Sequence, residues 1–373
     1  MFRILVLALL CMSISSCRQA GGSKTGSAEE SVLYFAKGEK EASQLPFAPE
    51  KMILLEETDS SLIKSVTQLF CGKSEIYLFD MPQQVVFVFD YEGNYVRRLQ
   101  RTGSGPEEYV LMTSISINEE LNQITVVDSG ERVLSYTLDT FDFVEASRFP
   151  GLSVEKVGKD KLLAFNTLPQ EKEGKQYDSH LLVYSPKGEI LEEHIPIDFP
   201  SGRVMYPSYR FFRYMNDLYF YPPFLPIVYK YDEEGLQKYY TLQFEGLEFP
   251  TIEFLQETER QGKSYLKELT KNELVYSMQF FETESYILTP FNAGMKAYAG
   301  IYDKQKQQGY YVMRREFGKP TTQVDMLKVM ATKDNCFVTV VTPSANADAA
   351  VENELLRKLI NSSNGNPILC FLK

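Results

Sequence analysis

The sequence predicts an all-β fold, and three features of the 373-residue chain support this prediction. Tyrosine and phenylalanine, which favour strands, are abundant at 24 and 25 residues. The apolar runs are short and end at turn residues, as strands do, and they lack the period of a helix. The same strand–strand–turn–strand pattern also recurs along the chain, which indicates a repeated sheet unit.

The first copy of this pattern is the clearest. Residues 76–80 and 85–90 are apolar runs, and an acidic-Gly-Asn turn at residues 92–94 leads into a third strand at residues 95–99. Such a turn between two strands is typical of a β-hairpin. The middle strands of the later copies fall at residues 123–128 and 132–136, 161–165 and 180–184, 217–221 and 227–231, 285–289 and 296–302, and 335–340 and 367–372.

Each copy spans about 40 to 65 residues and fits four antiparallel strands, the organisation of a β-propeller blade. An irregular β-sandwich is the alternative, but it has no reason to repeat this pattern. The sixth copy lacks a fourth strand, whereas the N-terminal region has a spare strand at residues 51–56. Because a circular array must close, we predict a six-bladed β-propeller, ahead of five or seven blades, whose N-terminal strand completes the last blade.

Two segments interrupt the strand pattern. Residues 251–276 and 347–361 are rich in helix formers. In the second segment, helical spacing is followed by Glu352, Leu355, Leu356 and Leu359. The two segments predict short helical insertions on a face or rim of the disc. An amphipathic cover over a blade edge and a docking helix for a partner are both compatible with this pattern.

The first residues resemble a bacterial export signal. Residues 4–12 are apolar but fall short of the ~20 residues that a membrane-spanning helix needs. Small residues precede Cys17, as in the lipobox of bacterial lipoproteins; an ordinary secretory signal with a chance cysteine is the alternative. We therefore predict a signal peptide at residues 1–16 and lipidation of Cys17. A flexible Gly/Ser-rich tether at residues 17–30 then precedes the propeller at residues 31–373.

The residues after Cys17 and the overall charge limit where the protein acts and what it binds. Neither an aspartate nor an acidic cluster follows Cys17, so we expect a lipid-anchored protein of the bacterial cell envelope, at the outer membrane and facing the periplasm. Removing residues 1–16 takes one arginine from the 39 basic residues and leaves all 50 acidic ones, so the mature chain has a formal charge of −12. An acidic chain without a basic stripe argues against nucleic acid as a partner.

The cysteines predict buried, inert thiols. Cys71, Cys336 and Cys370 lie in apolar runs without CxxC spacing, and the chain has only two histidines, so neither a metal nor another cofactor is expected. A disulfide between Cys336 and Cys370 is left open, because the sequence alone does not place the two residues side by side.

The stretch GNYVRRLQRTGSGPEEY at residues 93–109 resembles the G-rk-G-x-GPGEY signature of a family, the six-bladed β-propeller lipoproteins of Bacteroidetes, which are related in fold to NHL-repeat propellers. The ending NPILCFLK also resembles that family, and the resemblance covers residues 17–373. Glu107 stands where the signature has glycine, which puts the inner geometry of the loop in doubt. The resemblance implies the fold, the lipid anchor and a role in the envelope, but no reaction.

The loop at residues 101–109 is the first candidate site. It lacks both GxGxxG and the GK[ST] ending of a phosphate-binding loop, and no helix follows it. Its adjacent carboxylates, Glu107 and Glu108, point opposite ways in an extended segment, so they do not flank one glycosidic bond. We expect a connector between the first two blades that is structural alone, or that also presents Arg101, Glu108 or Tyr109 to a ligand at the channel mouth.

The aromatic segment at residues 206–224 is the second candidate site. Tyrosines and arginines are interleaved there, and on an exposed face they could stack on sugar rings or bind carboxylates. Strand alternation would instead bury half of them between blades. The preferred ligand contacts are Tyr206, Tyr209, Arg210 and Arg213, because they precede or open an innermost strand.

The sequence shows no catalytic set. Asn118, Asn166 and Asn292 are loose candidates for the metal-binding set of lactone-hydrolysing six-bladed propellers. Neither His180 nor His194 completes a triad, and both are expected at the surface or at blade edges. We therefore expect a non-enzymatic propeller that binds a ligand or protein, such as a glycan or peptide, on one disc face. A metal-dependent hydrolase or lactonase with its site at the central channel is the alternative.

Overall fold

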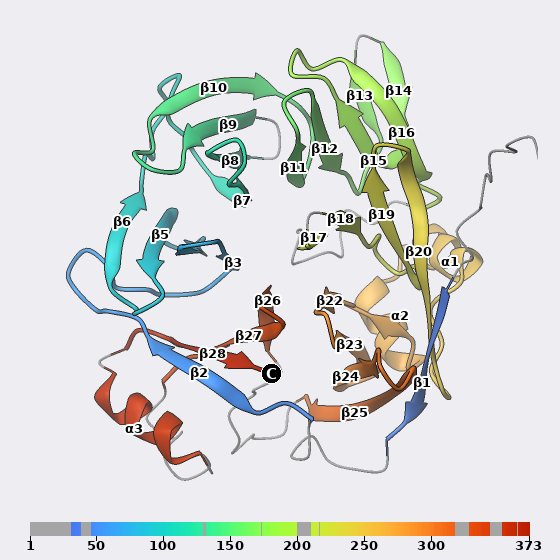
Figure 1. Cartoon of the computed structure of the whole chain (residues 1–373). Coiled ribbons are helices and arrows are strands. Elements are labelled where there is room, and N and C mark those ends of the chain that lie inside the picture. The colour runs from blue at the N-terminus through green and yellow to red at the C-terminus, as the bar shows by residue number, and fades with distance from the viewer. Residues whose placement is uncertain are drawn as a thin grey trace, which may run out of the picture.

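The computed structural model describes residues 31–38, 46–129, 132–172, 174–199, 210–215, 217–317, 328–343, 353–363 and 365–373. Within these residues, six antiparallel blades surround a central axis (Figure 1), and the predicted all-β, six-bladed β-propeller is confirmed. The innermost strand of each blade borders the axis, and the outermost strand forms the rim.

The blades follow one another along the chain. Blade 1 comprises β3 (Gln68–Cys71), β4 (Glu75–Asp80), β5 (Val85–Asp90) and β6 (Tyr95–Leu99). Blade 2 comprises β7 (Met112–Asn118), β8 (Gln123–Asp128), β9 (Arg132–Thr137) and β10 (Phe143–Arg148). Blade 3 comprises β11 (Ser153–Val157), β12 (Lys161–Phe165), β15 (Ser179–Tyr184) and β16 (Ile190–Pro196), with the hairpin β13 (Gln170–Lys172) and β14 (Lys175–Tyr177) inserted. Blade 4 comprises β17 (Phe211–Tyr214), β18 (Asp217–Phe220), β19 (Ile227–Asp232) and β20 (Gly235–Phe244). Blade 5 comprises β21 (Val275–Tyr276), β22 (Phe281–Glu282), β23 (Tyr286–Ala293), β24 (Lys296–Asp303) and β25 (Gln308–Glu316).

Blade 6 is completed by a strand from the N-terminal part of the chain, as predicted. Its strands β26 (Val329–Lys333), β27 (Cys336–Val341) and β28 (Ile368–Leu372) pair in that order. β2 (Pro49–Leu54) adds the outermost strand by pairing antiparallel with β28. This pairing joins the two ends of the circular array and covers the edge that β28 would otherwise expose.

The described cysteines are free thiols. Cys370 lies opposite Thr339 in the pairing of β27 with β28. Cys336 packs into the core between blades 6 and 1, whereas Cys370 packs into the core on the opposite face of blade 6. The two cysteines are therefore on different faces of the sheet and do not form a disulfide.

An additional strand, β1 (Ser31–Lys37), was not predicted from the sequence. It lies between the rim strands of blades 4 and 5 and runs parallel to both, so that one continuous sheet joins the two blades (Figure 1). Phe35 is fully buried there and stacks on Phe244 at 5.0 Å between ring centres. Gly300 and Gly309 leave room for it, since a Cβ at either position would lie 3.1 Å from the Phe35 ring.

The core lies between the blades, because each blade packs one face against each neighbour. In β4, Ile76 and Leu78 pack toward blade 6 with Phe371, whereas Tyr77 and Phe79 pack toward blade 2. Both faces of the strand are thus buried, and for this reason the middle strands appear in the sequence as continuous apolar runs.

The predicted helical insertions contain the helices of the described chain. These are α1 (Ile252–Arg260), α2 (Tyr265–Lys271) and α3 (Glu354–Ser362); residues 347–352 of the second insertion lie outside the described residues. Leu255 and Leu269 bury against Phe199, and Leu356 and Ile360 extend the core of blades 5 and 6. None of these described helices is long and apolar enough to cross a membrane.

Candidate functional site

A cavity of about 590 Å³ lies at the centre of the disc. Its walls come from the innermost strands of blades 1, 2, 4, 5 and 6 and from the turns that follow those strands, here called the inner turns. The inner turns contribute Gly72, Lys73, Glu119, Glu120, Met215, Thr283, Glu284, Asp334 and Asn335. Several of these side chains are exposed, so the cavity opens to solvent at this face, which we call the mouth. Small-molecule pockets measure ~300–1,000 Å³, and this cavity is therefore the candidate site.

Aromatic and methionine side chains form part of the cavity wall. Phe70, Phe212, Tyr214, Phe281 and Met330 line the cavity and are all partly buried. The ring of Phe212 stacks on the tyrosine opposite it in β18 at 4.7 Å, which fixes its orientation. The wall thus presents apolar and π-faced surface to whatever enters.

Polar contacts at the inner turns tie blade 1 to both of its neighbours. Lys333 of blade 6 donates from Nζ to the carbonyl oxygen of Gly72 at 2.8 Å, and the Tyr91 hydroxyl donates to the same oxygen at 2.7 Å. Glu119 of blade 2 accepts the backbone N–H of Lys73 at 2.7 Å. A β-carbon at Gly72 would lie 2.5 Å from the Glu119 carboxylate, so this close approach requires glycine.

Blade 3 is tied to both of its neighbours through the backbone of β11. Asn118 of blade 2 donates to the carbonyl oxygen of Lys156 at 3.0 Å. Arg213 of blade 4 donates to the same oxygen at 3.1 Å and to the Glu155 carboxylate at 2.8 Å. The Glu155 side chain is only 2% exposed, so the carboxylate of this ion pair is shielded from water, whereas the Arg213 side chain is 27% exposed.

Blade 5 is tied to both of its neighbours by equivalent contacts. Lys304 forms an ion pair with Glu282 at 2.8 Å and donates to the Tyr214 hydroxyl of blade 4 at 3.4 Å. Asn335 of blade 6 accepts the backbone N–H of Ser285 and donates to its hydroxyl. Within the described residues, each of the six blade interfaces thus carries such a contact, and we call the set the interblade ring. Much of the polar lining of the cavity belongs to this ring.

Two titratable groups in the cavity wall have shifted pKa values. Burial raises the pKa of Glu282, and the ammonium group of Lys304 opposes this rise. Burial of the sulfur raises the pKa of Cys71 to about 12. Such a thiol stays protonated at neutral pH and is a poor nucleophile. Cys71 therefore does not provide an activated nucleophile at the cavity.

The loop at residues 101–109 connects the rim strand of blade 1 to the innermost strand of blade 2. It precedes β7, whereas the inner turn follows β7, so the loop lies at the opposite end of that strand from the mouth. The described lining of the cavity includes none of its residues. Tyr109 is fully buried between the two blades, where its hydroxyl donates to the Gln84 carbonyl at 2.9 Å and accepts the Arg101 N–H at 3.0 Å.

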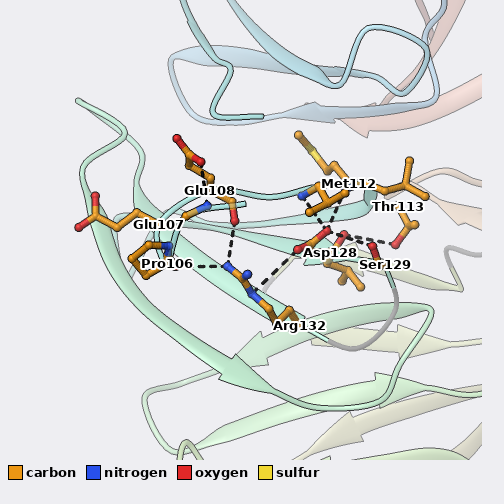
Figure 2. Close-up of polar contacts among 12 residues, drawn as sticks. Pro106, Glu107, Glu108, Met112, Thr113, Asp128, Ser129 and Arg132 are labelled. Carbon is orange, nitrogen blue, oxygen red and sulfur yellow. Dashed lines mark hydrogen bonds and ion pairs between the residues drawn. The ribbon is translucent and has the colours of Figure 1, made fainter. Parts of the chain in front are cut away.

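Arg132 and Asp128 hold this loop in place, as Figure 2 shows. The Arg132 guanidinium donates to the carbonyl oxygens of Glu108 at 2.8 Å and Pro106 at 3.2 Å. The Asp128 carboxylate accepts the next backbone N–H groups of the chain, from Val110 at 3.1 Å and its neighbour at 2.9 Å. These contacts fix the backbone of the loop where it passes from blade 1 to blade 2, which is consistent with a structural connector.

The remaining candidate side chains of the loop also make internal contacts. The Glu108 carboxylate folds back to accept the Gly105 N–H at 2.8 Å. Arg101 lies 5.6 Å from the Tyr136 ring centre and 3.6 Å from the Glu107 carboxylate. A ligand role for Arg101, Glu108 and Tyr109 stays a prediction, but such a ligand would not occupy the central cavity.

The structure separates the residues predicted in the aromatic segment. Tyr206 and Tyr209 lie outside the described residues. Arg210 is 3% exposed, donates to the Met278 carbonyl at 3.2 Å and lies over the Tyr221 ring; burial lowers its pKa to about 10. Among the predicted contacts that the structure describes, Arg213 lines the cavity.

One of the two histidines differs from its predicted surface or blade-edge position. His180 is 1% exposed, packs near the Phe165 and Phe199 rings, and makes a 2.9 Å hydrogen bond with the Asn166 carbonyl through Nδ1. The expectation of a surface or blade-edge role was therefore wrong for His180. His194 is partly exposed on β16 and lies 2.9 Å from Glu192.

The asparagines considered for a metal site do not converge. Asn118 lines the cavity, whereas the described cavity lining contains neither Asn166, which is buried in blade 3, nor Asn292, which lies on β23. Among the residues that the structure describes, no group of three His, Cys, Asp or Glu side chains is placed to hold a metal ion.

The fold and its central cavity define a six-bladed β-propeller with a solvent-open axial pocket. Residues 23–340 match the DUF5128 family, described as "6-bladed beta-propeller", and the chain belongs to this family. No curated protein matches the chain.

Two solved structures from Bacteroides are similar in fold. One, from Bacteroides fragilis and named "Putative exported protein", is 22% identical with a TM-score of 0.81, over 92% of this chain and 99% of that one. The other, a member of the duf4221 family from Bacteroides vulgatus, is 11% identical with a TM-score of 0.53, over 88% of this chain and 97% of that one. At these identities the likeness extends to the fold alone.

Proposed function

We propose that this propeller is a non-enzymatic binding protein of the bacterial cell envelope, which holds a ligand in its central cavity. The ligand is a small molecule or a segment of a larger partner, such as a peptide or glycan. The observation that carries this proposal is the cavity of about 590 Å³, open at the inner turns and lined by aromatic side chains. Apolar pockets with a few polar groups are the usual form of a ligand site.

The interblade ring supports binding over catalysis. Two carboxylates of the cavity wall make structural contacts instead: Glu119 joins blade 2 to blade 1, and Glu282 is paired with Lys304 of the same blade. A catalytic group must be free to contact the reacting atoms, and a group fixed in an interface contact is not. A binding site needs only a cavity of suitable shape and a wall that contacts the ligand, and the cavity with its aromatic wall provides both.

The N-terminal sequence supports the envelope location. The apolar stretch and the small residues before Cys17 fit a lipoprotein signal, and the GPEEY stretch fits the Bacteroidetes lipoproteins. We propose that residues 1–16 are removed and that lipidated Cys17 anchors the disc at the outer membrane, facing the periplasm. Membrane fractionation of wild type and Cys17→Ala tests this anchor. The variant is expected in the soluble fraction, and a variant that stays with the membrane contradicts the anchor.

A tryptophan at the mouth tests the cavity. Because the chain contains no Trp, Met215→Trp adds a single fluorescent reporter at an inner turn. Met295→Trp is the matched control, since it lies on an exposed turn outside the described cavity lining. A panel of glycans and short peptides, screened by NMR on the wild type, should yield binders that change the fluorescence of the Met215→Trp variant and leave that of the control unchanged.

Two results would overturn the proposal. The first is a set of binders that alters the fluorescence of the Met295→Trp variant but not that of Met215→Trp, because the site would then lie elsewhere. The second is turnover of lactones or phosphoesters by the purified protein that EDTA abolishes. That result would favour the metal-dependent hydrolase.

A further inference from the structure

We infer that the cavity takes a ligand that combines a cationic ammonium or guanidinium group with an apolar body. This inference rests on the proposed function and names the class of ligand for the same site. The cation belongs either to a free organic amine or to a basic residue of a peptide, and the chemistry of recognition is the same for both.

Two charged pairs in the cavity wall are already neutralised. Arg213 is paired with Glu155, which lies outside the described lining, and Glu282 is paired with Lys304. Their charges are satisfied within the protein, so they contribute little to the field at the mouth.

The charges that remain at the mouth are unbalanced. The remaining charged side chains are Lys73, Lys333, Glu119, Glu120, Glu284 and Asp334. Four carboxylates therefore face two ammonium groups, and Lys333 is itself 3.7 Å from Asp334. Glu120, Glu284 and Asp334 are exposed and come from blades 2, 5 and 6, so negative charge is distributed around the opening. Such an arrangement attracts a cation and repels an anion.

The aromatic wall favours the same ligand. The faces of aromatic rings carry negative electrostatic potential and attract cations, while their bodies bury apolar groups. The wall already accommodates one ammonium group, because Lys304 Nζ lies 4.7 Å from the centre of the Tyr214 ring. Phe70, Phe212 and Phe281 come from three different blades, so a ligand in the cavity would contact rings from several directions.

Ligands that share one apolar body and differ in charge test this inference. Phenethylamine, phenethyl alcohol and 3-phenylpropionate carry a cationic, a neutral and an anionic group on the same ring and short chain. Acetylated Lys-Phe-Lys, Gln-Phe-Gln and Glu-Phe-Glu tripeptides repeat the comparison on a peptide. Binding is measured by NMR titration of the wild-type protein and by fluorescence of the Met215→Trp variant, at low and at high salt. The amine and peptide series distinguish the two sources of the cation.

Variants that remove carboxylates at the mouth test whether these carboxylates cause the preference for a cationic ligand. A triple variant carries Glu120→Gln, Glu284→Gln and Asp334→Asn. Its matched control carries Asp59→Asn, Glu189→Gln and Glu233→Gln, which change the same total charge at exposed positions outside the described cavity lining. Phe281→Leu removes one aromatic face and keeps an apolar side chain. Circular dichroism melts show whether each variant is folded.

We expect the cationic member of at least one series to bind best. The triple variant at the mouth should lower the affinity for this ligand about ten-fold at low salt, whereas the control variant should change that affinity little. Phe281→Leu is expected to weaken it about two- to five-fold.

Equal binding of the cationic and neutral members overturns the inference and leaves the proposed function intact. An equal loss of affinity for the cationic ligand in the mouth and control variants also overturns the inference, because binding would then depend on the overall charge of the protein and not on the charges at the mouth. If no member of either series binds, the ligand class is refuted, and the glycan and peptide panel with the Met215→Trp reporter remains the test of the cavity as the binding site.

Discussion

Arg213 of blade 4 reaches across the interface to the Glu155 carboxylate of blade 3, 2.8 Å away and almost fully shielded from solvent. Removing one partner of a buried ion pair leaves an uncompensated charge, which costs roughly 3–5 kcal/mol. Arg213→Met should therefore lower the free energy of unfolding by about 3 kcal/mol. Urea titration followed by circular dichroism measures this change.

Arg260→Met is the control for this prediction, because Arg260 pairs with Glu257 on the exposed surface of α1. An exposed pair contributes ~0–1 kcal/mol, so the control should change stability by less than about 1 kcal/mol. Equal effects of the two variants would show that the contact between blades 3 and 4 adds no more than a surface pair.

The strand β1 offers an internal comparison of buried and exposed side chains. Phe35 is fully buried between the rim strands of blades 4 and 5, whereas the adjacent Tyr34 is 50% exposed. Truncating a buried phenylalanine costs ~3–5 kcal/mol, so Phe35→Ala should lower the free energy of unfolding by about that amount. Tyr34→Ala should cost less than about 1 kcal/mol. If both variants unfold at the wild-type urea concentration, β1 does not stabilise the disc.

The connector loop predicts a non-additive pair. A β-carbon at Gly103 would lie 2.0 Å from Glu108 Oε2, so Gly103→Ala must displace the carboxylate that accepts the Gly105 N–H. We expect Gly103→Ala and Glu108→Ala each to cost about 1 kcal/mol, the typical worth of one hydrogen bond. The double variant should cost little more than either one, because both remove the same contact.

Thermal melts of the two single variants and the double variant measure this coupling. Ser104→Ala is the control within the same exposed loop and should melt like the wild type. If the stability losses of the two single variants add fully in the double variant, Gly103 stabilises the loop independently of Glu108.

The buried histidine predicts a dependence of stability on pH. Burial lowers the pKa of His180 in the folded protein, whereas in the unfolded chain the pKa is about 6.5. As the pH falls below that value, the unfolded chain binds the proton first, so the free energy of unfolding decreases with acidification. Urea titrations between pH 7.5 and pH 5 should show this decrease in the wild type and a smaller one in His180→Gln.

His194→Gln is the matched control, because His194 is the other histidine of the chain and is partly exposed. It should retain the wild-type decrease. A pH dependence that survives His180→Gln unchanged would assign the effect to other groups.

The blades could be predicted from the sequence because their signals are local. Runs such as residues 85–90 are apolar on both faces, and glycines with positive φ, such as Gly93 at +93°, mark the turns between strands. The closing strand β2 could be predicted by counting strands. β1 could not, because it is flanked by polar residues and pairs in parallel with strands far away in the sequence.

Apart from Arg213 and Asn118, the lining of the candidate site could not be predicted, for a different reason. Residues such as Glu120, Glu284 and Asp334 are ordinary turn residues, and only circular closure brings them to one opening. The glycine-rich loop at residues 101–109 attracted more attention because its composition is unusual. Its glycines are explained by the close approach of Glu108 rather than by a ligand.

The pairing of β1 and β2 constrains the order in which the sheets of the protein can form during folding. β1 needs β20 and β25, and β2 needs β28, so the strands that leave the ribosome early find their partners only after most of the chain has followed. During that interval two strands stay without hydrogen-bonded neighbours, and one of them carries Phe35. Unpaired apolar strands favour aggregation, so chaperone capacity during synthesis should limit how much of this protein a cell can assemble.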